Sequence, residues 1–297
     1  MVNKSELEAK LNELQKWFQE NPKLPQEIDR NLLKRFLKCM NCDIEETKKL
    51  IELNYSLRMK NPYIFLDRDP DDEAIEQVRE VVDIVPMPGL TPDRCKIICS
   101  RLVEHDANKH DSIEECKFFF MLSDSRFTMN DVDTEQDSSI NENNSDSDSV
   151  TELDKMADGD IQVCDATGYT LRHVYKVSIS TMRMHMKFLQ EAYPVRLRSL
   201  HMINCPSYMN KLIAILKPFI RDDVYKLVHF HTNGLDSLYE HVPREMLPEE
   251  FGGSAGKLED IKAKWKEIVK EKREYLMDQK YWKMVPVQTS GRWSWFS

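Results

Sequence analysis

Short apolar segments alternate with amphipathic segments between residues 158 and 253. Residues 161–165 form a predicted buried strand that ends at the turn 166–168, and residues 197–203 and 228–231 predict two more strands. Helices are predicted between them, because apolar side chains recur at helical spacing up to Pro194 and again over residues 207–220. Strands that alternate with helices of this length are typical of a parallel sheet with crossover helices. The pattern therefore predicts an α/β domain.

The predicted helix at residues 207–220 differs from the others. Its apolar residues surround most of the helix and do not form a single stripe. A helix that covers one face of a sheet needs only one apolar stripe. The surplus apolar surface is therefore expected to contact more protein or an apolar ligand.

The N-terminal part predicts helices without strands. Capping boxes begin at Ser5 and Asp43, and Asn–Pro pairs at residues 21–22 and 61–62 end the first and third helices. Proline and glycine between residues 86 and 92 mark the passage into the sheet domain. Further elements are expected as helices over residues 32–40, 71–82, 111–127 and 258–269 and as a first strand over residues 95–102.

The net charge of −9 is concentrated in one segment. Residues 131–158 contain ten acidic side chains and one lysine, are rich in Ser and Asn, and include no aromatic residue. Such a composition cannot bury enough apolar area to offset the entropy of ordering. We expect a disordered acidic insertion over residues 128–157, which is either a solvated linker or a docking segment for a protein partner.

Composition favours a cytoplasmic protein. No segment approaches the roughly 18–20 apolar residues of a membrane span, and the N-terminus is polar. Seven cysteines without framework spacing are typical of reduced thiols. Motifs for hydrolases and phosphate-binding loops are absent, as is a basic, aromatic-studded surface for nucleic acid. Cys39 with Cys42, and His229 with His231, have ligand-like spacing, but neither pair has further ligands nearby, so no metal and no cofactor are expected.

Several motifs, in this order, resemble those of the CRAL-TRIO lipid-binding family. They lie at residues 159–169, 193–196, 201–206, 216–219 and 247–253, and the block 29–65 resembles the family's small N-terminal helical domain. The resemblance implies a helical domain over residues 1–70, then a CRAL-TRIO domain over residues 71–256 with a mostly parallel sheet and a lipid cavity under a movable lid helix. A C-terminal helix and an aromatic tail would follow over residues 257–297.

The resemblance also implies residues that line the cavity. Ser123 matches a serine that helps to hold the ligand's polar head in tocopherol-binding members, whereas Phe119 stands where those members have another serine, which makes the pocket bulkier and drier. The alternative is that these are ordinary core residues. The expected ligand contacts are Cys116, Phe119, Phe120, Ser123, Val163, Phe188, Leu189, Leu200, Leu212, Ile213 and Leu216.

Two further features follow from the resemblance. Residues 204–227 match a lid that opens at a membrane and closes over the ligand. Arg196 and Arg198 match two positions of a phosphoinositide-binding patch, but Asp223 and Leu227 occupy the other two. Nearby basic residues that are expected to substitute are Lys217, Arg221 and Lys226.

We therefore predict a non-enzymatic carrier of a hydrophobic small molecule, such as a tocopherol, retinoid, carotenoid or phospholipid. Carriage would consist of sequestration in the cavity and release at a bilayer through transient membrane contact. Two alternatives remain: a phosphoinositide- or protein-binding adaptor with a vestigial pocket, and an enzyme that acts on a bound lipid. The apolar residues do not identify the ligand, because apolar pockets discriminate by only about 1–3 kcal/mol per methylene.

Overall fold

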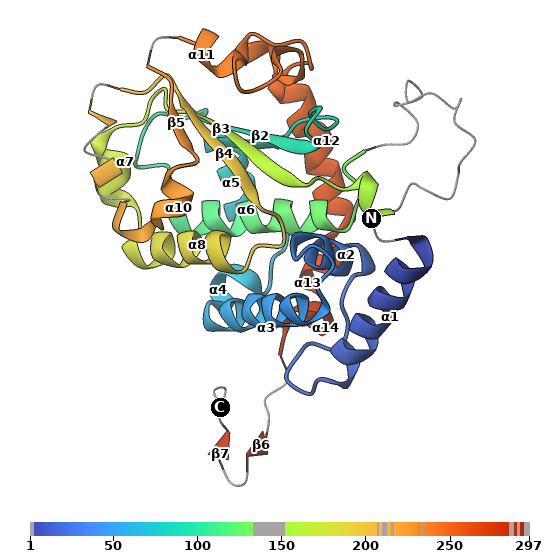
Figure 1. The fold of residues 1–297 in the computed structure, drawn as a ribbon. Helices are drawn as coiled ribbons and strands as arrows, with labels where there is room; N and C mark the ends of the chain where they lie inside the picture. Colours follow the sequence, from blue (N-terminus) through green and yellow to red (C-terminus); the bar gives the residue numbers. More distant parts are fainter. Residues whose placement is uncertain are drawn as a thin grey trace.

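A five-stranded sheet forms the centre of the molecule (Figure 1). The computed structural model describes residues 3–132, 152–206, 208–209, 213–214, 217–232, 234–284, 288–289 and 292–293. In order across the sheet, the strands are β1 (Val82–Pro86), β2 (Cys95–Leu102), β3 (Gly159–Asp165), β4 (Leu197–Ile203) and β5 (Val228–Phe230). β1 is antiparallel to β2, and all the other neighbours are parallel. The predicted α/β class with a mostly parallel sheet is confirmed.

The edge strand β1 was not predicted. Its residues had been assigned to the end of a helix and to the passage between domains, because Pro86 lacks a backbone N–H donor. The strand nevertheless pairs with β2 from Val82 opposite Leu102 to Pro86 opposite Ile98. Proline is tolerated in this position because it is the last residue of an edge strand.

The N-terminal domain consists of helices that pack on the sheet domain. They are α1 (Lys4–Glu20), α2 (Arg30–Cys39), α3 (Ile44–Lys60) and α4 (Pro62–Phe65). Side chains of Asn3, Asp29 and Asp43 cap the first three helices by accepting backbone hydrogen bonds, so the first helix begins with Asn3 as its cap and not with Ser5 as predicted. The apolar sides of α1–α3 form one buried cluster with Phe120 of α6 and with α8.

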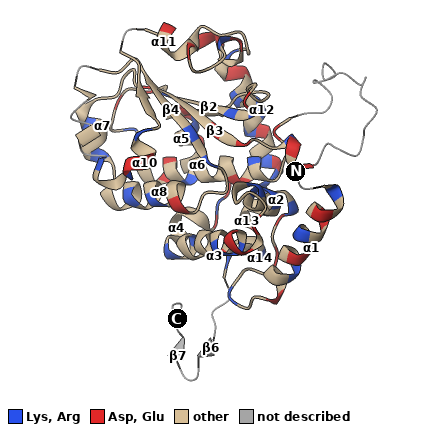
Figure 2. Ribbon diagram, in the orientation of Figure 1, with Lys and Arg blue, Asp and Glu red and all other residues tan. Residues whose placement is uncertain are grey.

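Helices cover both faces of the sheet. α6 (Ser112–Phe127) and α8 (Ile179–Glu191) lie under one face (Figure 1), which we call the inner face. The opposite, outer face packs in a buried cluster with α12 (Leu258–Glu271) through Ile161, Val163 and Ile203. Charged residues of both signs occur along α1 and α12 (Figure 2), as expected for helices with a solvated side.

Short elements complete the sheet domain. They are α5 (Glu73–Val81), the 3₁₀ turn Glu152–Lys155, α7 (Leu171–Lys176), the 3₁₀ turn Lys217–Phe219, α10 (Asp222–Tyr225), α11 (Asp236–Tyr239), and the 3₁₀ turns Arg244–Met246 and Glu249–Phe251. The sequence did not predict α7. It also predicted one helix over residues 207–220, whereas the end of that segment is a 3₁₀ turn. The lid positions 207, 210–212 and 215–216 lie outside the described residues.

Both flanks of the acidic insertion are folded, which corrects the boundaries 128–157. Thr128 and Asp131 are buried before the insertion, and Leu153 and Met156 are buried after it. The flanks are ordered because they contact the N-terminal domain: Lys38 donates hydrogen bonds to the carbonyls of Leu153 and Met156, each at 2.6 Å. Residues 133–151 lie outside the described part of the chain.

The chain after α12 returns to the N-terminal domain. α13 (Arg273–Met277) and α14 (Gln279–Trp282) place the buried Trp282 ring 4.8 Å from the Arg58 guanidinium and 4.4 Å from that of Arg68. Two-residue strands β6 (Gln288–Thr289) and β7 (Arg292–Trp293) pair with each other. The last residues of the predicted aromatic tail, 294–297, lie outside the described residues.

Candidate functional site

Apolar side chains of β4 and the edge strand β5 are not fully covered on the inner face. Leu200 and Met202 of β4 point to this face, because Ile203 packs into the outer-face cluster and side chains alternate along a strand. Val228 and Phe230 of β5 pair with them in register. All four are only half-buried. Since interiors are normally close-packed, half-buried apolar groups between two layers indicate space between the sheet and the helices.

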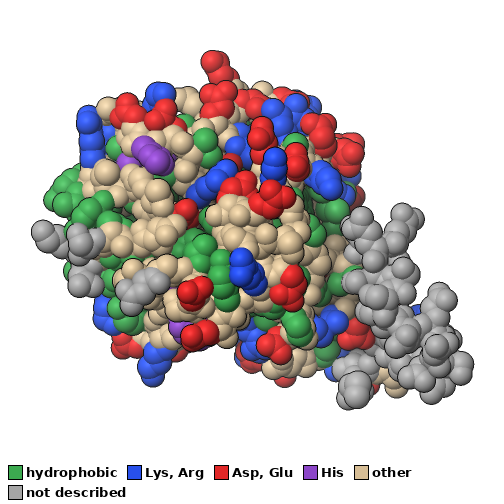
Figure 3. Space-filling model, turned by 90° about the horizontal axis from the view of Figure 1, so that it is seen from above, with side chains coloured by type: hydrophobic (Ala, Val, Ile, Leu, Met, Phe, Trp, Pro, Cys, Tyr) green, Lys and Arg blue, Asp and Glu red, His purple; other side chains and the backbone are tan. Residues whose placement is uncertain are grey.

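A cavity of about 240 Å³ lies between the N-terminal halves of α6 and α8. Its wall is mostly apolar with a few polar groups, which is typical of small-molecule sites. The lining residues are Ile84, Ser112, Glu115, Cys116, Phe119, Val177, Thr181, Met182, His185 and Met186. Hydrophobic side chains also gather in a hollow near the centre of the face seen in Figure 3.

The polar groups of the cavity are held neutral or are paired. The Cys116 Sγ atom lies 3.1 Å from His185 Nδ1. Burial raises the pKa of Cys116 to about 12 and lowers the pKa of His185 to about 4. Burial also raises the pKa of Glu115, whose Oε1 atom lies 2.7 Å from His110 Nδ1. At neutral pH the Cys116–His185 pair is therefore uncharged, unlike an activated thiolate.

Two of the predicted ligand contacts line the cavity, and two others are half-buried outside its lining. Cys116 and Phe119 line the cavity. Leu200 is half-buried on the inner face, and Leu189 of α8 is half-buried at the edge of the cluster shared with the N-terminal domain. These four positions remain predictions for ligand contact.

Other predicted contacts are placed differently. Val163 packs in the outer-face cluster, on the other side of the sheet from the cavity. Phe120 and Phe188 are fully buried against Phe65 of the N-terminal domain, with ring centroids 4.7 and 4.9 Å from it. Ligand roles for these three do not fit their packing, because neighbouring protein already occupies their surfaces. The periodicity of the sequence indicated that these three side chains are buried. It did not indicate which buried cluster each of them joins.

Ser123 is also engaged within the protein. Its hydroxyl accepts a hydrogen bond of 2.9 Å from the Tyr193 hydroxyl, and both side chains are buried. A ligand head group would have to share or displace this contact. His185, which the sequence did not single out, lines the cavity instead.

The described part of the predicted lid segment, residues 204–227, contacts α8 and the sheet domain. Gln190 of α8 donates to the carbonyl of Phe219 at 2.9 Å and accepts from the backbone N–H of Arg221 at 2.8 Å. Ile213 packs against the small cluster of Ala166 and Met209. The predicted contacts Leu212 and Leu216 lie outside the described residues.

The predicted basic residues fall into two groups. Arg196 and Arg198, with Lys38 of α2, border a cleft of about 210 Å³ between the N-terminal domain and the chain before β4. Asp158 lies in the same cleft and pairs with Lys38 at 2.7 Å. The geometry therefore adds Lys38, which the sequence did not suggest.

The second basic group lies in residues 217–226 and is largely paired. Arg221 forms an ion pair with Asp223, and Lys217 lies 3.6 Å from Asp222. Lys226 is exposed at the end of α10. Neighbouring carboxylates thus reduce the positive charge that this group presents.

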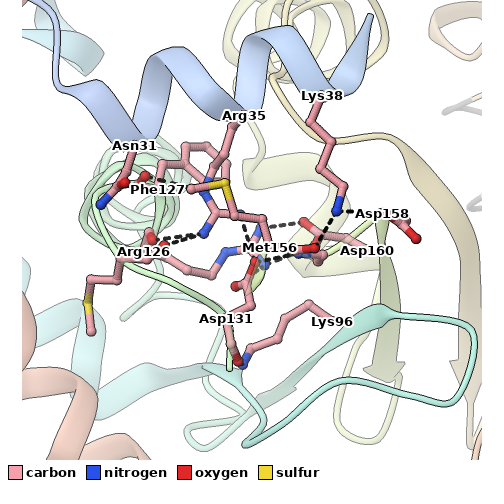
Figure 4. Close-up of polar contacts among 12 residues, drawn as sticks. Asn31, Arg35, Lys38, Lys96, Arg126, Phe127, Asp131, Met156, Asp158 and Asp160 are labelled. Carbon is pink, nitrogen blue, oxygen red and sulfur yellow. Dashed lines mark hydrogen bonds and ion pairs between the residues drawn. The ribbon is translucent and has the colours of Figure 1, made fainter. Parts of the chain in front are cut away.

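A buried ionic network, which the sequence did not reveal, joins α2 to the sheet domain (Figure 4). The Arg35 guanidinium donates to Asp131 at 2.7 Å, and Arg126 donates two hydrogen bonds to Asp160 at 3.0 and 2.7 Å. Lys96 donates to the backbone carbonyl of Asp131. Burial lowers the pKa of Lys96 to about 8. The network holds in place one wall of the basic cleft, since Arg35 also lines it.

Four histidines gather on the outer face of the sheet. His229 and His231 lie on the same face of β5, as their alternation predicted. His201 and His241 lie beside them, and the centroid of the His201 ring is 4.9–5.4 Å from the centroids of the other three rings. His201 Nδ1 lies 3.0 Å from His231 Nε2. Burial and the neighbouring imidazoles lower the pKa of His201 to about 3. Among the described residues, no group of three or more side chains is arranged to hold a metal ion.

Within the described part of the chain, none of the helices has the length and apolar content that crossing a bilayer requires. The fold and the cavity define a class of protein: an α/β domain with a mostly apolar cavity between two helices and the edge strand β1, preceded by a helical domain. Residues 82–253, more than half of the chain, match the family model of the CRAL/TRIO domain, and residues 3–75 match that of the Pinta-like UBA domain. The chain belongs to the CRAL/TRIO family, whose members bind and transfer lipophilic ligands and are not known as enzymes.

Individual relatives agree with this assignment. Alpha-tocopherol transfer protein-like of Homo sapiens is 23% identical over 250 residues, which are 84% of this chain and 65% of that protein, so the match spans just under two thirds of the relative. Clavesin-1 of Rattus norvegicus is 32% identical over 105 residues, which are 35% of this chain and 30% of that protein. The crystal structure of Sfh5 shares the fold, with a TM-score of 0.50 at 15% identity over 86% of this chain and 87% of that one.

Proposed function

We propose that this protein binds a lipophilic small molecule between the inner face of the sheet and helices α6 and α8, and transfers it between membranes. One observation supports the proposal above the others: Leu200, Met202, Val228 and Phe230 are half-buried on the inner face of β4 and of the edge strand β5, and a cavity with a mostly apolar wall lies between α6 and α8. A tocopherol, a retinoid, a carotenoid and a phospholipid all fit this description.

Sequestration needs no catalytic group. Removing an apolar chain from water stabilises the complex by about 0.8 kcal/mol per methylene. The polar side chains of the cavity are neutral or paired, and the Cys116 thiol has the raised pKa of an inert cysteine. The chemistry of the wall thus favours binding over turnover.

Exchange would use the lid segment, residues 204–227. Gln190 links this segment to α8 through two hydrogen bonds to backbone atoms. Such a segment can adopt an open packing when few contacts must break. Replacing Gln190 with leucine (Gln190→Leu) is expected to speed lipid transfer between vesicles several-fold, because the closed packing loses both bonds. An unchanged rate would contradict this role of the segment.

The direct test of the carrier function is to extract protein purified from its native source with organic solvent and to identify the extract by mass spectrometry. The expected result is one lipophilic compound in near-equimolar amount, which is recovered unchanged after incubation. A mixture far below equimolar amount, with no uptake from loaded vesicles, would contradict the proposal. Chemical conversion of the compound during incubation would indicate an enzyme.

A second candidate function is recognition of phosphoinositide head groups. The cleft bordered by Arg196, Arg198 and Lys38 supports it, because phosphates are bound by clustered Arg and Lys side chains. In this function the protein would act as a membrane-bound adaptor, with or without a ligand in the apolar cavity. The acidic insertion would then be available to a protein partner.

A further inference from the structure

One ring nitrogen of His185, in the wall of the cavity, has no hydrogen-bond partner among the described residues. Ser112 and Thr181 both contact Ser178. The Ser112 Oγ atom accepts a hydrogen bond of 3.1 Å from the backbone N–H of Ser178, and Thr181 Oγ1 donates one of 3.1 Å to the Ser178 hydroxyl. Glu115 contacts His110. His185 contacts Cys116 through Nδ1, but no described residue forms a hydrogen bond with its Nε2 atom.

The surroundings of His185 fix its position. Its ring lies 5.0 Å from the ring of Phe119 and 5.2 Å from that of Phe120, measured between centroids. Cys116 lies on α6 one helical turn before these two residues, on the side that lines the cavity. The imidazole is therefore confined between aromatic rings and a thiol, which leaves its second nitrogen at the cavity.

The thiol also determines which nitrogen has the proton. Sulfur is a weak acceptor, whereas an unprotonated imidazole nitrogen is a strong one. The favoured arrangement is therefore donation from the Cys116 S–H to Nδ1 of His185, which leaves the proton on Nε2. The pKa values of both groups agree with a neutral pair. In this arrangement Nε2–H is a donor that no described residue accepts, in the wall of a mostly apolar cavity.

We infer that the Cys116–His185 pair recognises the polar end of the bound molecule, and that this end is a carbonyl oxygen, as in a ketone, aldehyde, quinone or ester. The inference rests on the proposed carrier function and specifies its ligand class. A carbonyl accepts a hydrogen bond and has no hydrogen of its own to satisfy. A carboxylate or phosphate is disfavoured, because the cavity wall contains Glu115 and no lysine or arginine.

The test compares three probes with the same apolar body: a long-chain methyl ketone, the corresponding secondary alcohol, and the parent alkane. Each is loaded into phosphatidylcholine vesicles, and the amount extracted by the protein is measured. Wild-type protein is expected to extract the ketone about tenfold better than the alkane, because only the ketone accepts a hydrogen bond from Nε2–H in this mostly apolar cavity. The alcohol should fall between them.

Variants assign the preference to the pair. His185→Leu should abolish the preference for the ketone while still extracting the alkane, and Cys116→Val should reduce it. His105→Leu, the same substitution at an exposed histidine outside the cavity wall, is the matched control and should leave the ratio unchanged. The infrared band of an isotope-labelled ketone carbonyl should shift to lower frequency in wild-type protein and in His105→Leu, but not in His185→Leu. Thermal melts establish that each variant is folded.

The outcomes separate the inference from the proposed function. If wild-type protein extracts the ketone and the alkane equally, or if folded His185→Leu keeps the preference, the inference is wrong and the carrier function stands. If wild-type protein extracts none of the three probes, the carrier function fails, and the inference fails with it.

Discussion

The carboxylate of Asp131 lies 2.7 Å from the guanidinium of Arg35, and the side chains of both are almost completely buried. The backbone N–H of Ala157 donates to the same carboxylate at 2.8 Å, and Arg126 lies 3.6 Å from its other oxygen. One carboxylate therefore joins three parts of the chain: helix α2, helix α6, and the segment that follows the acidic insertion.

Asp131→Asn is expected to destabilise the protein by about 3–5 kcal/mol, because it leaves buried arginines without their counter-charge. Arg35, Arg126 and Lys96 hold the pKa of Asp131 well below its usual value. This stabilisation is therefore present above the unfolded pKa of about 3.8 and is lost as pH falls below it.

Urea unfolding at neutral pH measures the effect of Asp131→Asn on the free energy of unfolding. Asp222→Asn is the matched control, because its carboxylate is 92% exposed, and it should change stability by less than about 1 kcal/mol. Equal effects of the two substitutions would contradict the role of the network.

Asp131 also shows where sequence reasoning stops. Its neighbours in the chain are acidic and polar, so local composition predicted a solvated, disordered position. Its partner Arg35 is 96 residues away, and composition contains no information on such pairing. The strands β2–β5, by contrast, followed from local periodicity, and the family followed from short motifs in order. In the site, periodicity predicted helix α6, and the resemblance to the family selected Cys116 and Phe119 as cavity residues. It did not identify His185, because a single histidine in an amphipathic helix gives no signal of the cavity or of its contact with a thiol on another helix.

The outer-face histidines predict a pH-dependent stability. The pKa of His201 is lowered from 6.5 to about 3, so the unfolded chain binds a proton over this range that the folded protein does not. The contribution of His201 to the free energy of unfolding is complete above pH 6.5 and is lost as pH falls. The free energy of unfolding should fall by up to about 1.4 kcal/mol per pH unit from this group. The groups that face it are His229, His231 and His241, and Glu240 acts on His231.

Urea unfolding between pH 7 and pH 5 tests this prediction. His201→Asn should have a shallower dependence on pH than wild-type protein, whatever its stability at pH 7. His105→Gln is the control, since His105 is exposed and lies outside the cluster. If the free energy of unfolding of His201→Asn depends on pH as steeply as that of wild-type protein, other groups cause the acid sensitivity.

The two groups of basic residues predict different effects on vesicle binding. Replacing both Arg196 and Arg198 with alanine should weaken binding to vesicles that contain bisphosphorylated phosphatidylinositol, by about 1 kcal/mol for each charge removed. Arg221→Ala should have less effect, because Asp223 already neutralises Arg221. Flotation of vesicles with and without the phosphoinositide measures this. If wild-type protein binds both vesicle types equally, the cleft is a solvated charged surface and phosphoinositide recognition is excluded.

The cavity itself predicts opposite responses to one substitution on the two faces of β4. Leu200 is half-buried on the inner face and belongs to none of the buried clusters of described residues, whereas Ile203 is fully buried in the outer-face cluster. Leu200→Trp should therefore change the stability of ligand-free protein little, since the indole enters space that protein does not fill. Ile203→Trp should destabilise it by about 1–3 kcal/mol or more through overpacking. Val103→Trp, at a position that is 49% exposed, controls for the added indole.

Ligand uptake distinguishes these variants further. Leu200→Trp is expected to extract several-fold less lipid from vesicles than wild-type protein and Val103→Trp, because the indole occupies ligand space. Urea unfolding and extraction of a fluorescent lipid provide the two readouts. If Leu200→Trp destabilises the protein as much as Ile203→Trp and leaves uptake unchanged, the inner face is an ordinary packed core. The lipophilic molecule would then have to bind elsewhere.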